Sequence, residues 1–270
     1  MRFIGHLDFM RFFQKVIRRA GLDIRFSEGI SPHMVMSFAS PLGVGMTSEG
    51  DYVDIELNTP VSTETALRAL NENSVPDVRF TDFIQVEEGK AGKAMALVAA
   101  ADYLIGFREG CAPAEDWTSD LPAFLEQKEI IVTRRKKKAV KKADGKKKRH
   151  QKDGGDKESG EAPGLEENVT ETLDIRPLIY QARPVRSGNR PMLQMRLSSG
   201  SAANLRPELV MEAFAAFAGR SFDAFTLQIH RLDLLARAEN GGTGEIRFVP
   251  LSALGKPAEG ADTQKAAGVN

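Results

Sequence analysis

The sequence predicts an α+β protein built from two ferredoxin-like (βαββαβ) halves, the first of which lacks its opening strand. Three observations support this fold class. Helical and strand-like hydrophobic patterns alternate along the chain, a similar order of elements occurs twice, and a highly charged segment interrupts only the second half. We therefore expect an N-terminal domain over residues 1–98, a C-terminal domain over residues 99–240, and a disordered or loosely ordered tail over residues 241–270.

The composition is that of a globular protein in a reducing compartment. Hydrophobic residues make up 41% and charged residues 27% of the 270 residues, which leaves enough apolar material for a core. Lys and Arg together number 37, as do Asp and Glu, so any attraction to nucleic acid must be local. The single cysteine, Cys111, excludes an intramolecular disulfide and an iron–sulfur cluster held by this chain's own thiolates. We expect a cytoplasmic protein with no cofactor and no metal. We expect no membrane partner, because no stretch approaches the roughly 20 apolar residues that span a bilayer.

The first half opens with an amphipathic helix over residues 7–20, where apolar residues recur at three- and four-residue spacing. Asp8 suits the positive end of the helix dipole, and Gly21 can adopt the left-handed conformation that ends a helix. The elements that follow are strands over residues 22–26, 34–39 and 52–57, a helix capped by Ser62 or Thr63, and a strand over residues 78–86. Because the opening strand of the βαββαβ unit is missing, we expect that the chain was cut, or its start misassigned, at an internal Met.

The second half repeats this alternation of strands and helices. Its predicted elements are a strand over residues 101–108, a helix near residues 114–127, strands over residues 130–134, 175–183 and 192–198, a helix over residues 207–218 and a strand over residues 226–236. The second helix is the best marked of these, because Pro207 suits a first helical turn and Gly219 a helix end.

A block of positive charge followed by a block of negative charge separates these strands. Residues 134–152 hold twelve Lys or Arg against one Asp, and residues 153–174 hold eight Asp or Glu against one Lys. Such runs cannot bury enough apolar area to offset the loss of chain entropy. We therefore predict a disordered insert at about residues 136–171.

Residues that could carry chemistry concentrate near the start of the chain. Residues 27–33 place hydroxyls, a carboxylate, a glycine and an imidazole in a loop between two predicted strands. The catalytic candidates are His6, Asp8, Glu28 and His33, and the neighbouring binding candidates are Ser27 and Ser31. Three interpretations stay open: a turn with its own hydrogen bonds, a metal site on the two histidines, and a serine nucleophile with His33 as its base. The turn is favoured, because no third metal ligand stands at a diagnostic spacing and no strand–elbow–helix motif surrounds the serines.

The remaining candidates are binding residues. Arg11, Arg18 and Arg19 share the polar side of the first helix with Lys15, where they could hold nucleic-acid phosphates or form an ordinary solvated face. Ser37, Glu49 and Tyr52 belong to loop-like segments rich in glycine and hydroxyls. Asn204 and Arg206 precede the helix at residue 207, where an anion could bind free backbone N–H groups or the loop could simply cap the helix.

At these residues the sequence resembles an uncharacterised bacterial family, the radical SAM-associated (radical SAM-linked) proteins. The matching stretches in the first half are Met1-Arg2-Phe3-Ile4-Gly5-His6-Leu7-Asp8, Arg18-Arg19-Ala20, residues 27–33, Ser37-Phe38-Ala39, Pro41-Leu42-Gly43-Val44-Gly45, and Glu49 with Tyr52 and Asp54. In the second half they are Asn204-Leu205-Arg206-Pro207-Glu208 and Ile229-His230-Arg231. The likeness covers nearly everything outside the charged insert and the tail.

The resemblance implies a role beside another enzyme. The family occurs fused behind, or encoded beside, a cobalamin-binding radical SAM protein, and often near ribonuclease G or ribosomal protein genes, which implies a link to RNA or the ribosome. We therefore expect a noncatalytic accessory or substrate-presenting partner of a radical SAM enzyme that modifies RNA or the ribosome. The alternatives are an enzyme with a His/Asp/Glu site in the N-terminal domain and a stand-alone RNA-binding protein. In each case we expect His6, Asp8, Glu28, Ser31 and His33 to converge on one concave surface, with Arg11 or Arg18 nearby.

Overall fold

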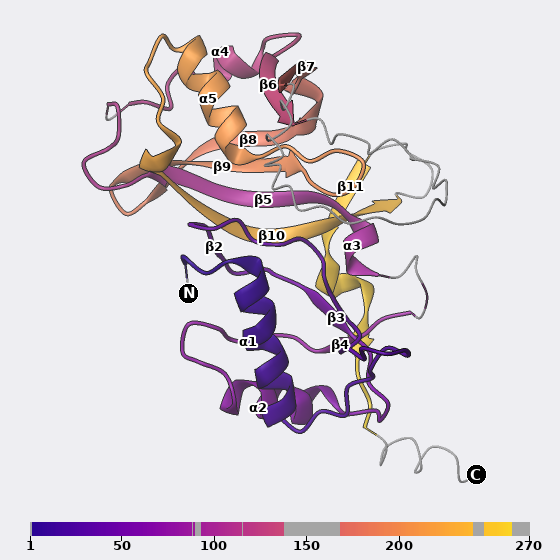
Figure 1. The fold of residues 1–270 in the computed structure, drawn as a ribbon. Helices are drawn as coiled ribbons and strands as arrows, with labels where there is room; N and C mark the ends of the chain where they lie inside the picture. Colours follow the sequence, from indigo (N-terminus) through magenta and orange to yellow (C-terminus); the bar gives the residue numbers. More distant parts are fainter. Residues whose placement is uncertain are drawn as a thin grey trace, which may run out of the picture.

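The structure is a computed structural model that describes residues 2–87, 89, 93–114, 116–137, 168–239 and 246–260. It is a mixed α+β fold, which confirms the α+β part of the predicted class (Figure 1). The helices are α1 (His6–Arg19), α2 (Thr63–Glu72), α3 (Ala94–Leu97), α4 (Leu121–Leu125) and α5 (Pro207–Phe217). The strands are β1 (Met36–Phe38), β2 (Thr47–Ser48), β3 (Val53–Ile55), β4 (Ile84–Gln85), β5 (Val98–Phe107), β6 (Ile131–Lys137), β7 (Asn168–Asp174), β8 (Ile179–Ser187), β9 (Arg190–Ser198), β10 (Leu227–Glu239), β11 (Ile246–Pro250) and β12 (Lys256–Pro257).

Within the described residues, the largest sheet has six strands and most of them come from the second half of the chain. Its order is β11-β10-β5-β9-β8, and all neighbours along this path are antiparallel. β2 belongs to the first half but pairs in parallel with β10, through His230↔Thr47 and Arg231↔Ser48. The two halves of the chain therefore share a sheet.

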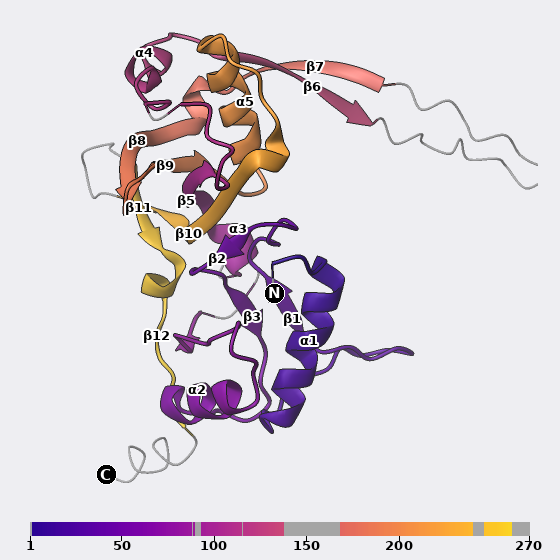
Figure 2. The same ribbon diagram turned by 90° about the vertical axis from the view of Figure 1, so that its left-hand side faces the viewer.

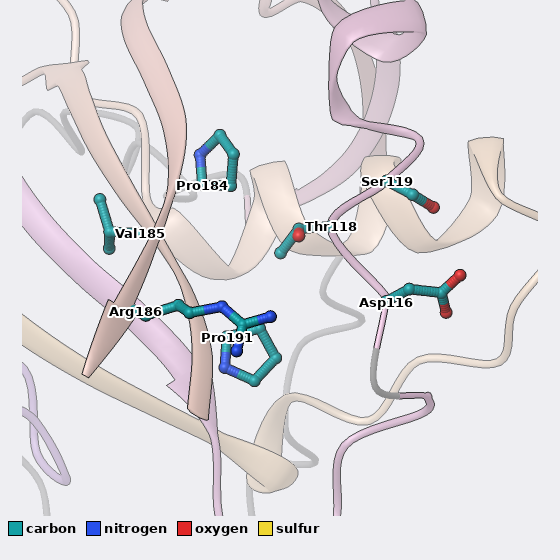
Figure 3. Close-up of a pocket in the computed structure, with 7 residues that line it drawn as sticks. All are labelled: Asp116, Thr118, Ser119, Pro184, Val185, Arg186 and Pro191. Carbon is teal, nitrogen blue, oxygen red and sulfur yellow. The ribbon is translucent and has the colours of Figure 1, made fainter. Parts of the chain in front are cut away.

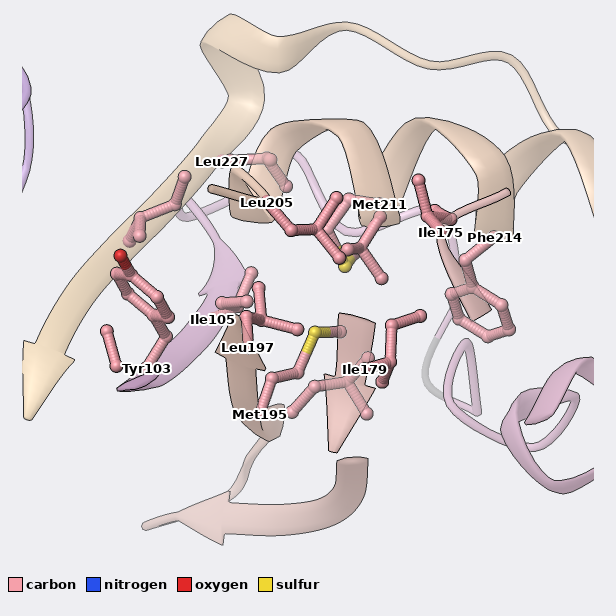
Figure 4. Close-up of a cluster of buried hydrophobic side chains, with 14 of the residues drawn as sticks. Tyr103, Ile105, Ile175, Ile179, Met195, Leu197, Leu205, Met211, Phe214 and Leu227 are labelled. Carbon is pink, nitrogen blue, oxygen red and sulfur yellow. The ribbon is translucent and has the colours of Figure 1, made fainter. Parts of the chain in front are cut away.

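Alternation along these strands gives the sheet two chemically different faces. On one face, buried apolar side chains pack beneath α5, as Figure 4 shows for Ile105, Met195 and Leu197 below Leu205 and Met211. Directly paired residues point to the same side of a sheet, so the intervening residues lie together on the opposite face. We call this second side the polar face; it carries the rows Asp102–Arg196, His230–Leu104–Gln194–Arg183 and Gln228–Gly106.

The N-terminal part packs around α1 and lies below β10 in Figures 1 and 2, whereas α5 lies above β5 and β9. Phe13, Val16 and Ile17 bury the apolar side of α1 in a separate cluster with Met34 and Leu70. The antiparallel pair β1–β3 lies beside this cluster. Two isolated bridges, Ile24↔Leu57 and Phe26↔Met34, pair the segments next to these strands. The three- and four-residue periodicity of α1 thus predicted its buried face correctly.

The C-terminal segment differs from the loosely ordered tail that the sequence predicts. β11 extends the large sheet, and β12 then pairs with β4 in the N-terminal part, as the yellow chain in Figure 1 shows. Gly255 permits this approach, because a Cβ atom there would lie 2.7 Å from the carbonyl oxygen of Gln85. Thr63 adds hydrogen bonds to Ala258 at 3.0 Å and 2.8 Å. Backbone pairing to distant partners orders this segment, and a single sequence does not reveal which strands it pairs with.

Other boundaries also depart from the predictions. The strand predicted over residues 22–26 forms only isolated bridges, and the one over residues 78–86 shrinks to β4. The helix predicted near residues 114–127 is reduced to α4, since residues 116–121 form turns with hydrogen bonds of their own. A 3₁₀ turn, Arg176–Leu178, separates β7 from β8 at Pro177. The predicted disordered insert lies mostly outside the described residues; its described ends belong to β6 and β7.

Candidate functional site

A buried arginine joins the two parts of the chain. The side chain of Arg231, on β10, is 3% exposed and binds the carboxylate of Asp51 through both Nε and Nη2. Nη2 also donates to the carbonyl oxygen of Ser40 at 3.0 Å. A buried guanidinium is tolerated only where its charge and its N–H groups find partners. Residues 40–51 therefore supply the carboxylate and the carbonyl oxygen that the buried guanidinium requires.

A second contact lies next to the first. The hydroxyl of Tyr52 donates to Oδ1 of Asp233 at 2.7 Å, and the same oxygen accepts the backbone N–H of Leu234 at 2.8 Å. Burial raises the pKa of Tyr52 to about 12 and also raises the pKa of the Asp233 carboxyl. Gly50 allows the two segments to meet, because a Cβ atom there would lie 2.7 Å from the carbonyl oxygen of Leu232. Together with the Arg231 pair, this contact forms what we call the β10 junction.

His230 occupies the solvent-facing edge of the β10 junction. Its Nδ1 lies 2.7 Å from Oγ1 of Thr47, and its Nε2 lies 3.2 Å from a carboxylate oxygen of Glu49. The side chain of Glu49 is 72% exposed and that of His230 only 24%. Both ring nitrogens are thus engaged, which fixes the orientation of the imidazole.

The polar face of the sheet contains a hollow beside this imidazole, with a volume of about 230 Å³. We call it the sheet hollow; its lining residues are Thr47, Leu104, Gly106, Phe107, Ser187, Arg190, Pro191, Met192, Gln228 and His230. A larger and more open hollow of about 620 Å³ lies between the loop before α4 and the β8–β9 hairpin. Figure 3 shows Arg186 extending there toward the loop that carries Asp116 and Thr118.

The predicted catalytic residues do not form one cluster. The ring of His6 packs edge-on against Phe38, with 5.2 Å between centroids, and Asp8 forms an exposed pair with Arg11 at 3.1 Å. His33 instead binds Ser27, whose Oγ lies 2.8 Å from Nδ1. Within the described part of the chain, no hydrogen bond, ion pair or ring contact joins His33 to His6 or Asp8.

The loop over residues 27–33 folds on itself as a hairpin. The backbone N–H of Ser27 donates to the carbonyl oxygen of His33 at 2.8 Å, next to the bridge Phe26↔Met34. Figure 2 shows this indigo segment projecting away from α1, and Glu28 and Ser31 are exposed on it. These contacts therefore do not bring the predicted catalytic residues onto one shared concave surface. They agree better with the interpretation of residues 27–33 as a turn with its own hydrogen bonds.

The other predicted binding residues fall into four places. Glu49 and Tyr52 lie at the β10 junction, and Ser37, on β1, lies opposite Asp54 of β3. The side chains of Arg11, Arg18 and Arg19 are exposed on α1. Asn204 and Arg206 are exposed before α5, where Arg206 occupies the N-cap position without a capping side-chain hydrogen bond.

Sequence reasoning missed the contacts between the N-terminal part and β10. Asp51 and Asp233 are not among the predicted site residues, and Arg231 enters only through the family resemblance, because the contacting residues stand about 180 positions apart in the sequence. One signal was available in the strand itself. Leu227 and Ile229 begin a period of two that makes residue 231 inward-facing, and an arginine at a buried strand position requires an acidic partner.

Two further observations concern metal sites and membranes. In the part of the chain that the structure describes, no three His, Cys, Asp or Glu side chains gather in a way that could hold a metal ion. No helix among the same residues has the length and apolar character needed to cross a membrane.

Comparison with known proteins identifies the family. Residues 1–159, more than half of the 270-residue chain, match a family described as "Uncharacterized protein conserved in bacteria (DUF2344)". Searches of the curated proteins and of the solved structures each found no match. The match confirms the resemblance to an uncharacterised bacterial family, and this chain belongs to the bacterial DUF2344 family.

Proposed function

We propose that this chain is a noncatalytic accessory protein that presents RNA to a cobalamin-binding radical SAM enzyme. The observation that carries the RNA part is the cationic face of α1, which consists of Arg11, Lys15, Arg18 and Arg19. All four side chains are exposed. Asp8 pairs with Arg11, whereas no ion pair within the described residues engages the other three.

The geometry of α1 suits a phosphate backbone. The opposite side of the helix is anchored by Phe13, Val16 and Ile17, so the cations are presented on a fixed element. From Arg11 to Arg19 the helix rises about 12 Å, at about 1.5 Å per residue. Cations held at this density displace counterions from a single strand and bind it without regard to sequence.

RNA binding is tested with the full chain and a fluorescein-labelled single-stranded RNA in an anisotropy titration. Replacing Lys15, Arg18 and Arg19 together by Ala should weaken binding about tenfold or more at moderate salt. The matched control replaces three exposed cations on other elements, Arg237, Arg247 and Lys256, by Ala and should change the affinity much less. An α1 variant that binds as well as the control variant would overturn the proposal.

The partnership with a radical SAM enzyme is supported by the family resemblance and by the cysteine count. A radical SAM cluster needs three cysteine ligands, and this chain has only Cys111, so any such chemistry must come from another protein. Co-expression of the tagged chain with a cobalamin-binding radical SAM protein from the same genome should yield a complex that survives ribonuclease treatment. Purification of the chain with RNA but without that protein would instead favour the stand-alone RNA-binding alternative.

We also propose that the C-terminal half is a ferredoxin-like unit. Its strands β5, β8, β9 and β10 occur in that order along the chain, with the β6–β7 pair between β5 and β8. They lie in the order β10-β5-β9-β8 with antiparallel neighbours, which supports this assignment. The same assignment for the N-terminal half stays a prediction. There β1 and β3 form their own pair, while β2 and β4 pair with β10 and β12.

A further inference from the structure

We infer that the sheet hollow binds one unpaired nucleobase, with its phosphate, from the RNA that the chain holds. This inference rests on the proposed function and assigns to it a base-binding site separate from the cationic face of α1. It follows from the way β5, β9 and β10 place apolar, aromatic, amide and guanidinium groups around one small volume.

The floor of the hollow is apolar. Leu104 and Gly106 alternate along β5 on the polar face of the sheet, and Met192 stands beside Gly106 on β9. The Met192 methyl group leans over the glycine, because a Cβ atom at Gly106 would lie 3.0 Å from it. An apolar floor of this kind accepts the face of a heteroaromatic ring.

His230 forms a wall of the hollow whose orientation is already fixed. Its ring is held by Thr47 on one nitrogen and by Glu49 on the other, at 2.7 Å and 3.2 Å. An aromatic ring that is ordered before binding loses little conformational freedom when a base stacks on it. Bases in single-stranded RNA commonly stack on aromatic side chains, including histidine.

The rim carries groups that suit the edge of a base and a phosphate. Gln228 is exposed, and no described residue hydrogen-bonds its carboxamide, which offers one donor and one acceptor group to a base edge. Arg190, across the hollow, forms an ion pair with Glu109 at 3.4 Å and with no other described residue, and both side chains are more than half exposed. Such a surface pair is weak, so the guanidinium is available to a phosphate.

The volume limits what can enter. Pockets for drug-sized ligands measure about 300–1,000 Å³, and the 230 Å³ hollow falls below that range. A small apolar molecule would not use the amide or the guanidinium, and an anion alone would not use the floor. A single nucleotide unit uses all of these groups.

The site can be tested by methyl NMR on the full chain with ¹³C-methyl-labelled methionine, in which Met192→Leu assigns the Met192 resonance. AMP, GMP, CMP and UMP are the probes, added one at a time, with inorganic phosphate as the comparison. At least one nucleotide should shift the Met192 resonance, and Gln228→Ala should weaken that binding about tenfold. Gln181→Ala, an exposed glutamine on β8 outside the hollow, is the matched control and should leave the affinity unchanged.

The role of Arg190 has its own comparison. Arg190→Ala should remove the preference for a nucleotide over its nucleoside and leave nucleoside binding intact. If no nucleotide shifts the Met192 resonance, or if inorganic phosphate alone gives the same shift, the inference is overturned. The proposed function fails separately, because it requires RNA affinity to depend on Lys15, Arg18 and Arg19, a dependence that the anisotropy titration measures without reference to the hollow.

Discussion

The buried guanidinium of Arg231 and the partly exposed carboxylate of Asp51 form a charge pair between positions 180 residues apart in the sequence. The pair fastens the segment after β1 to β10. Asp51→Ala would leave a guanidinium that is 3% exposed without its counter-charge. We expect the free energy of unfolding in urea to fall by about 3 kcal/mol. Arg183→Ala removes an exposed arginine that binds Gln194 and should cost less than about 1 kcal/mol; equal losses in the two variants would contradict this account.

Close backbone approach at Gly50 leads to a second prediction. Gly50→Ala places a methyl group against the carbonyl oxygen of Leu232 and the carboxylate of Asp233, at 2.7 Å and 2.6 Å. Because backbone must move to relieve this clash, we expect a loss of about 1–3 kcal/mol by thermal unfolding. Gly5→Ala is the control, since a Cβ atom at Gly5 meets no atom within 4 Å. An unchanged melting temperature for Gly50→Ala would show that the segments are not packed this closely.

The raised pKa of Tyr52 predicts a loss of stability at alkaline pH. The native protein holds the phenolic proton up to about pH 12, whereas an ordinary tyrosine loses it near pH 10. The stabilisation is therefore complete below pH 10 and disappears as the pH rises from 10 to about 12. Tyr52→Phe should cost about 1–2 kcal/mol at neutral pH, where Asp233 loses its donor. Urea unfolding should show this difference shrinking above pH 10; a constant difference would be contrary to the expected titration.

The hairpin over residues 27–33 should tolerate substitution. Ile30 is fully exposed, and the Ser27–His33 hydrogen bond is internal to the hairpin. Ile30→Asp should change the free energy of unfolding by less than about 0.5 kcal/mol. Ile24→Asp, at a position that is 5% exposed, should destabilise the protein severely, because it buries an unpaired charge. Circular dichroism melts of both variants would check this contrast, and a large loss for Ile30→Asp would place the hairpin in the folded core instead.

Local patterns predicted much of the fold. The periodicity of α1, Pro207 at the first turn of α5, and the alternation in β5, β9 and β10 depend on neighbouring residues, and each element lies close to its expected position. The pairings of β2 with β10 and of β4 with β12 could not be predicted, since two-residue strands carry no periodic signal. Their partners lie in another half of the chain.

In the candidate site, too, local sequence features were predictable and contacts between distant segments were not. Glu49 and Tyr52 were candidates from their loop composition, and both belong to the β10 junction. Their partners, His230 and Asp233, follow from strand register, which a single sequence does not reveal. His33 was grouped with His6 because of its place in the sequence, but the short bridge Phe26↔Met34 closes its loop first.

The salt dependence of RNA binding tests the central claim most directly. Each cation that neutralises a phosphate of a single strand adds about 0.7 to the slope of log K against log salt concentration. The slope should therefore be shallower by about 2 when Lys15, Arg18 and Arg19 are replaced by Ala, relative to the unmodified chain. An α1 variant with the same slope and the same affinity as the unmodified chain would contradict the claim that this helix holds RNA.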